Sequence, residues 1–562
     1  MRIRESQRAK LGGPILGLLT VVSAVLVGGM GQPTPVRAQG TLGDGPDGVE
    51  IPITPDEVNQ VIRNAAEAVA GESLSVAVTD RRGALLALYS RPGATPAIEE
   101  SALASARTGA FFGENQAPLT SRTVRFISGI HFPPGVPNQE NADLYGIENT
   151  NRVSRALAYN PGKFYPEPLN ITETGPGLGI NTGKVQPNDA NPNAVNPGGL
   201  PLYRQDFTKG FQAFARPDAF APLGITQIGG VGVAGVPPAA AEFAAFEATR
   251  AGEAPIPTQG ARAGQEAIQR FAARTFRPGT VYVGGIKLPL ADLKNARRPR
   301  GVAAGAFPGT GVLKIDPTAP GRAAAPAADG FLVGPVGNAE LTQAEVIQII
   351  GQCDAIARRT RAAIRLPLGS RARFVFAVGG LDGTILAVYR QPDATIFSMD
   401  VATAKARNAV YFSSPATDLT VFNPELRTLP AGTAITARTL NFASQPLFPA
   451  GINKSRPGPF FPLFMDDLAN PGGTGPLQND PRIAQPNINV NGIVWFPGST
   501  PLYRGGTLIG GLGVSGDGVA QDDFVSFNGA QGFLPPAGVR SDNFKVRNVR
   551  MPYFKFPRNP TL

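Results

Sequence analysis

The sequence of 562 residues contains one cysteine, Cys353, and one histidine, His131. A single cysteine excludes an internal disulfide bond, so the fold must depend on a hydrophobic core even if the protein is exported. One histidine and one cysteine also exclude a zinc site with the usual ligands and a Cys-His catalytic pair. Zinc hydrolases with these ligands and thiol proteases are therefore not expected.

The chain also has only a small excess of positive over negative charge. The formal net charge is +10, and without residues 1–38 the chain carries 47 basic against 41 acidic residues, a net charge of +6. These charges are dispersed rather than clustered, which argues against a nucleic-acid partner.

Long hydrophobic runs are confined to the N-terminal region. Four basic residues precede an uncharged run over residues 11–30, and small residues follow at 36–38. This pattern is typical of a signal peptide over residues 1–38, with the mature chain beginning near Gln39 in the periplasm or outside the cell. An uncleaved membrane anchor is the alternative, and only then is a membrane contact expected.

The most informative feature present is an internal duplication. Residues 82–95 reappear as residues 382–395 at a constant offset of 300, and further matches follow at offsets of 316 and 281. Repeated motifs with changing offsets predict two copies of one architecture with loops of different length. The predicted division is a signal peptide at 1–38, copy one at 53–290, a Pro/Ala/Gly-rich linker at 291–338 and copy two at 339–553.

Each copy has the same predicted order of elements. Thr54 and Glu57 form a capping-box pattern before an apolar helix stripe, and Thr342 and Glu345 repeat it in copy two, where Cys353 lies on the stripe as a small buried residue. A hairpin, a second helix, a long loop, a second hairpin and a final helix follow. This order predicts an α+β fold with an antiparallel sheet flanked by helices in each copy.

Glycine and proline are abundant in the chain, with 68 and 55 residues respectively. Their excess falls in the linker and in one insertion per copy, near 138–199 and 453–497, which we expect to be irregular surface loops. Glycines also alternate through the predicted strands at 228–233 and 509–514. Either a helix packs very closely on that face or a flat ligand approaches the backbone there.

Several motifs of copy two resemble the GlcG/HbpS haem-binding family. These are residues 378–389 with their Asp-Gly turn, 402–407, and 508–516 followed by Gln-Asp-Asp at 521–523. Copy one is less similar, because Ser105 replaces the helix lysine, Ala234 replaces a serine, and Ala241-Glu242 replaces the acidic pair. The resemblance implies profilin-like domains, frequent oligomerisation, and haem or corrinoid binding in some members, with no set of catalytic residues to transfer.

The candidate binding residues are arginines and tyrosines that recur in both copies. A guanidinium can bind a carboxylate through two parallel hydrogen bonds, and a tyrosine ring can stack on a planar ligand. Structural pairing with acids is the alternative for the arginines, and His131 is the only histidine that could be an axial haem ligand. The predicted ligand-binding residues are Arg107, Arg122, Tyr203, Arg204, Arg407, Arg438, Tyr503 and Arg504.

The leading hypothesis is an exported ligand-binding protein for haem, or for a related flat molecule that bears carboxylates, without turnover. The alternative is a structural or interaction module of the cell envelope, in which the copies form an internal pseudo-dimer or the protein a homo-oligomer. An enzyme ranks last because no general base is identifiable.

Overall fold

The computed structural model describes residues 52–117, 119–127, 144–147, 197–205, 225–249, 282–283, 286–287, 297–365, 369–450, 452–470, 472–483 and 485–562. The predicted signal peptide lies outside these residues. Within the described part of the chain, no helix is long and apolar enough to cross a membrane.

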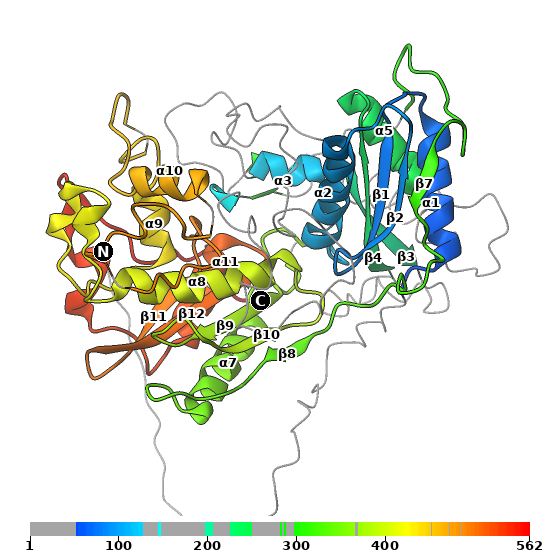
Figure 1. The fold of residues 1–562 in the computed structure, drawn as a ribbon. Helices are drawn as coiled ribbons and strands as arrows, with labels where there is room; N and C mark the ends of the chain where they lie inside the picture. The colour runs from blue at the N-terminus through cyan, green and yellow to red at the C-terminus, as the bar shows by residue number, and fades with distance from the viewer. Residues whose placement is uncertain are drawn as a thin grey trace, which may run out of the picture. The chain divides into compact units, whose positions relative to one another are not determined.

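The first half of the chain contains one five-stranded sheet with helices on both faces (Figure 1). Its elements are α1 (Pro55–Ala68), β1 (Ser75–Asp80), β2 (Leu85–Ser90), α2 (Pro96–Phe112), α3 (Ser121–Ile127), β3 (Gly199–Gln205), β4 (Ile225–Ala234), α5 (Pro238–Thr249), the hairpin β5 (Tyr282–Val283) and β6 (Ile286–Lys287), and β7 (Val312–Ile315).

The second half contains an equivalent sheet. Its elements are β8 (Gly330–Val333), α7 (Gln343–Ala357), β9 (Phe374–Gly379), β10 (Ile385–Arg390), α8 (Phe397–Ser413), α9 (Ala437–Ala443), α10 (Phe461–Ala469), β11 (Ser499–Arg504), β12 (Thr507–Gly516), α11 (Val519–Gly529), and the hairpin β13 (Lys545–Val546) and β14 (Val549–Arg550). Short 3₁₀ helices lie at Leu419–Val421, Pro424–Thr428, Ala537–Val539 and Ser541–Asn543.

Strand order is the same in the two sheets. The orders are β3-β4-β1-β2-β7 and β11-β12-β9-β10-β8, and all neighbouring strands are antiparallel. In each half one helix, α2 or α8, covers one face, while a helix pair, α1 with α5 or α7 with α11, covers the other. The two sheets fit two copies of one α+β domain, as expected from the sequence.

The first helix of each half begins at the predicted capping box. The Thr54 hydroxyl accepts a hydrogen bond from the Glu57 amide at 3.3 Å, and the Glu57 carboxylate accepts one from the Thr54 amide at 2.7 Å. Thr342 and Glu345 repeat both contacts. This arrangement satisfies amide groups that a helix N-terminus leaves unpaired, and it confirms the prediction at both positions.

The glycine-rich strands are explained by close helix packing. A Cβ atom added at Gly511 or Gly513 would lie 2.2 or 2.0 Å from a backbone carbonyl oxygen of α8, and Gly230 and Gly232 meet α2 in the same way. A side chain at these positions would push the helix off the sheet. Of the two explanations left open by the sequence, helix packing is therefore the one found.

Two predictions of irregular structure are wrong in part. The predicted linker contributes β7 to the first sheet and β8 to the second, because its apolar residues pair with the exposed edges of β2 and β10. The insertion at 453–497 forms α10 and buries Phe460, Trp495 and Phe496. Isolated aromatic residues in a Pro/Gly-rich segment are enough to anchor it to a core.

One hydrophobic cluster includes side chains of both halves. The ring of Phe112, at the end of α2, stacks on Phe397 at the start of α8, with ring centroids 4.2 Å apart. The Ile396 amide also donates a hydrogen bond to the Phe111 carbonyl oxygen at 3.1 Å. The two halves are thus joined by apolar packing as well as by polar contacts.

Candidate functional site

Two predicted arginines, Arg107 and Arg407, hold the turn between the first two strands of each half. Their Nε atoms donate to the carbonyl oxygens of Gly83 and Gly383 at 3.0 and 2.8 Å. Both side chains are buried, and Arg407 also donates to the Asn491 side chain at 2.9 Å. The two arginines occupy equivalent positions in the two copies. The contacts described here are with other groups of the protein.

A second pair, Arg122 and Arg438, bridges to the final helix of each half. Arg122 makes two hydrogen bonds to Glu242, at 2.9 and 2.8 Å, and the Arg438 Nε donates to Asp523 at 2.7 Å. Burial raises the pKa of Asp523, and the positive charge of Arg438 opposes this shift. The pairing with acids that was the alternative expectation for the arginines is therefore present at Arg122 and Arg438.

The two predicted tyrosines, Tyr203 on β3 and Tyr503 on β11, lie in the protein interior. The Tyr203 hydroxyl donates to the Glu114 carbonyl oxygen at 2.8 Å, and the Tyr503 hydroxyl donates to the Gly432 carbonyl oxygen at 3.4 Å. Both rings are buried. They pack inside the protein rather than forming an open stacking surface.

Of the remaining predicted residues, the structure describes the side chain of Arg504 alone. Arg504 is exposed on β11 and donates to the Glu340 carbonyl oxygen at 2.9 Å. His131 and the side chain of Arg204 lie outside the described residues. The predicted residues therefore lie in equivalent pairs in separate halves, and a ligand-binding role for them stays a prediction.

A buried ion pair distinguishes the second half from the first. Lys405 Nζ lies 2.9 Å from Asp522 Oδ2 and 2.7 Å from the Val514 carbonyl oxygen, and 5.0 Å from the centre of the Phe496 ring. Burial lowers the pKa of Lys405 and raises that of Asp522 to about 7. Both shifts show that the loss of hydration outweighs the mutual attraction of this pair.

The first half lacks both partners of this pair. Ser105 and Ala241 occupy the positions equivalent to Lys405 and Asp522. The equivalence holds in space, because a Cβ on Gly198 would meet the Ala241 Cβ at 3.2 Å, whereas a Cβ on Gly498 would meet that of Asp522 at 2.6 Å. Loss of both charges together avoids leaving one buried charge unpaired.

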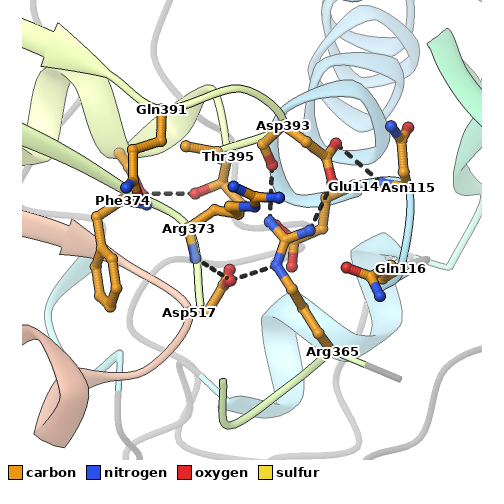
Figure 2. Close-up of polar contacts among 12 residues, drawn as sticks. Glu114, Asn115, Gln116, Arg365, Arg373, Phe374, Gln391, Asp393, Thr395 and Asp517 are labelled. Carbon is orange, nitrogen blue, oxygen red and sulfur yellow. Dashed lines mark hydrogen bonds and ion pairs between the residues drawn. The ribbon is translucent and has the colours of Figure 1, made fainter. Parts of the chain in front are cut away.

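A buried guanidinium connects the two halves (Figure 2). Arg365 contacts the carboxylates of Glu114, Asp393 and Asp517, and all four side chains are buried or nearly so. The backbone N–H of Asn115 also donates a hydrogen bond to the Asp393 carboxylate at 3.1 Å. Glu114 follows α2 of the first half, whereas the other charged groups belong to the second half.

Three carboxyl groups surround one cation in this cluster. Ionising all three would cost free energy, because the negative charges repel one another in a buried site. Burial raises the pKa of Glu114 well above its ordinary value, Arg365 opposes this, and the negative charges of Asp517 and Asp393 raise it further. The Glu114 carboxyl group therefore takes up a proton at a higher pH than an exposed glutamate does.

Arg365 belongs to a segment that the first half does not have. Residues 358–373 connect α7 to β9, whereas the shorter segment 69–74 connects α1 to β1. Counterparts of Asp393 and Asp517 in the first half are Gly93 and Val236. The cluster therefore depends on substitutions that only the second half carries, which the repeat could not reveal.

An open groove of about 490 Å³ lies at the C-terminal segment of the second half. A volume of this size falls within the range of about 300–1,000 Å³ that is usual for small-molecule sites. None of the predicted binding residues lines it. Its lining residues are Phe442, Phe527, Arg540, Asp542, Arg550, Met551, Pro552, Tyr553, Phe554 and Phe556.

The two arginines of the groove share one acid. Arg540 makes two hydrogen bonds to Asp542, at 3.1 and 2.8 Å, and the Arg550 Nε donates to the Asp542 carbonyl oxygen at 2.6 Å. The Arg540 guanidinium also lies over the Tyr553 ring, 4.7 Å from its centre. Asp542 thus holds two guanidinium groups close together at the groove.

Sequence reasoning missed this groove, although a local signal was present. Residues 551–556 read Met-Pro-Tyr-Phe-Lys-Phe, and Arg540 and Arg550 precede them. A dense aromatic and basic segment at the end of a domain is a signal for a binding surface. The contributions of Phe442 and Phe527 to the groove depend on the tertiary fold.

Comparison with known proteins gives one family match. Residues 352–531 match a family described as "Haem degrading protein HbpS-like". No curated protein sequence matches the chain.

Two solved structures are similar to parts of the chain. The structure entitled "Crystal Structure of PduOC:Heme Complex" is 18% identical, covers 37% of this chain and 97% of its own, and has a TM-score of 0.19. The Klebsiella pneumoniae protein ORFY is 17% identical, with 34% and 88% coverage and a TM-score of 0.21. The region that matches the HbpS-like family ends at residue 531, and most of the residues that line the groove lie beyond it.

Proposed function

We propose that this protein is an exported, non-catalytic binding protein for haem or a related flat molecule that bears carboxylates. The observation that carries the proposal is the groove at the C-terminal segment, where aromatic rings and two arginines line one surface. The HbpS-like match over residues 352–531 supports a ligand of the haem class. Export is inferred from the sequence pattern of residues 1–38.

The lining residues fit two parts of a haem molecule. Phe554 and Phe556 offer apolar surface for a flat macrocycle, and Arg540 and Arg550 offer charge for its propionates. When bound, haem supplies an iron centre with its own redox and ligand chemistry. The chain's own contribution would be to bind the ring, orient the carboxylates and shield one face from water.

Binding without turnover is proposed because the groove has no available base. Among the described residues that line the groove, Asp542 is the only acid, and this carboxylate is already paired with Arg540. A general base must reach the proton that it removes, and a carboxylate held by a guanidinium is a poor candidate. Once a reductant has converted the bound hemin to ferrous haem, the absorbance of the complex should therefore show no progressive loss over time.

Equilibrium dialysis of the purified chain against hemin tests the proposal. We expect about one equivalent of hemin to be retained, with an absorbance spectrum that differs from free hemin. Equal hemin concentrations on both sides of the membrane would overturn the proposal. Export is tested separately by N-terminal sequencing of the protein recovered outside the cytoplasm, which should begin near Gln39.

The second candidate is a structural or interaction module with no small-molecule ligand. Arg365 favours it, because this residue and its carboxylates join the two halves at a buried junction. An internal pseudo-dimer of this kind needs no ligand for its stability. Retention of a protein partner from an envelope extract, together with failure to retain hemin, would favour this candidate over the first.

A further inference from the structure

The groove lacks the groups that usually hold haem iron. Its lining residues in the described part of the chain include neither histidine nor cysteine, and the remaining iron-binding types are Tyr553 and Met551. These side chains are 2% and 1% exposed. Neither presents much surface to a ligand in the groove.

The chemical state of Tyr553 also disfavours coordination. Its hydroxyl is buried with no hydrogen-bond partner among the described residues. Burial raises the pKa of this phenol well above its ordinary value, so the group stays protonated. A tyrosine coordinates iron as phenolate, and burial makes the phenolate of Tyr553 costly to form, although the positive charge of Arg540 opposes this shift.

Exposed aromatic surface is present instead. Phe556 is 44% exposed and lies against the rings of Phe524, Phe527 and Phe554, with centroids 5.7, 5.4 and 6.1 Å away. The supporting rings fix the position of Phe556 while leaving much of its surface to solvent. A rigid, exposed ring of this kind suits stacking on a flat molecule.

The charge of the groove is arranged for more than one carboxylate. Asp542 accepts from Arg540 at both carboxylate oxygens, whereas its Oδ2 lies 3.6 Å from the Arg550 Nη2. The Arg550 side chain is 68% exposed. Two guanidinium groups close together match two carboxylates on the same edge of a ligand.

We propose that the groove binds a flat aromatic macrocycle that carries two carboxylates on one edge, and that it does so without coordinating a metal ion. This inference rests on the proposed function and specifies its recognition chemistry. Stacking on Phe556 and ion pairing with Arg550 supply the affinity. Iron in the ring is therefore dispensable.

The test compares three probes on the purified full chain by equilibrium dialysis. These are hemin, metal-free protoporphyrin, and protoporphyrin dimethyl ester, which keeps the ring but lacks the charges. We expect the dissociation constants of hemin and metal-free protoporphyrin to agree within about threefold, and the ester to bind about tenfold or more weakly, a difference that corresponds to about 1.4 kcal/mol.

Two substitutions locate the site. Arg550→Ala and Phe556→Ala should each weaken both acidic probes about tenfold, and both residues are exposed enough for the fold to survive. Arg482→Ala is the matched control, because Arg482 is an exposed arginine of the same half that pairs with Asp480 away from the groove. It should leave every dissociation constant unchanged.

The outcomes separate this inference from the proposed function. If hemin binds but metal-free protoporphyrin does not, the inference is overturned and the proposed function stands. If neither porphyrin binds, both are overturned. A third outcome is that both porphyrins bind, but the ester binds equally well or the two groove variants behave like Arg482→Ala. The inference that this groove recognises the carboxylates and the ring is then overturned.

Discussion

Lys405 and Asp522 form a fully buried ion pair in the second half, and the first half replaces both residues with small uncharged ones. Removing one partner leaves an uncompensated buried charge, so Asp522→Ala should lower the free energy of unfolding by about 3–5 kcal/mol. Urea unfolding at pH 7 measures this change.

The double variant Lys405→Ser with Asp522→Ala copies the first half. Because neither charge remains, its loss of stability should be smaller than the sum of the two single losses by at least about 1 kcal/mol. Additive losses in the same urea experiment would show that the two side chains do not depend on one another.

The raised pKa of Asp522 predicts a pH dependence of stability. In the folded protein this group keeps its proton up to about pH 7, whereas its ordinary pKa is 3.8. The protonated form therefore stabilises the fold at low pH, and this contribution falls as the pH rises from about 4 to 7, by at most about 4 kcal/mol. Between these limits the wild type should lose stability relative to Asp522→Asn. Parallel profiles for the two proteins would contradict a raised pKa.

The cluster between the halves predicts unequal effects at two contacting residues. Arg365→Met leaves Asp393 and Asp517 buried without a cation, and should cost about 3–5 kcal/mol. Glu114→Gln keeps the shape and an oxygen that can accept from Arg365, and it replaces a carboxyl group whose pKa is raised, so it should cost about 1 kcal/mol or less. Chemical denaturation at pH 7 distinguishes the two variants, and an equal cost for both would contradict a raised pKa of Glu114.

The glycine-rich strand predicts opposite effects for two Gly→Ala changes. A Cβ at Gly513 would lie 2.0 Å from the Ala402 carbonyl oxygen, so Gly513→Ala should destabilise by about 3 kcal/mol or more. Gly351 is exposed on α7 with nothing within 4 Å of its added Cβ, and Gly351→Ala should stabilise by about 0.5–1 kcal/mol. Thermal unfolding checks both, and a neutral Gly513→Ala would contradict close packing of α8.

Local patterns were sufficient for much of the fold. The capping box at Thr54, the hairpin turn at Gly383, and the burial of Cys353 depend on short-range spacing and were predicted. Helix packing on the glycine-rich strands was one of two explanations, and the sequence alone did not decide between them. The structure does so through the close approach of Gly513 to α8.

The contacts that were missed join residues far apart in the chain. Arg365 meets Glu114 across 251 positions, and neither residue belongs to a repeated motif. The groove likewise combines Phe442 from α9 with Tyr553 from the C-terminal segment. Repeats identify what the two halves share, and the Arg365 cluster depends on residues that the halves do not share.

The most direct test is a crystal structure of the chain grown with hemin, with the iron located by its anomalous signal. We predict the ring against Phe556, its two propionates at Arg540 and Arg550, and no protein atom bound to the iron. Iron bound by a protein side chain, or a ring held elsewhere on the chain, would contradict this account.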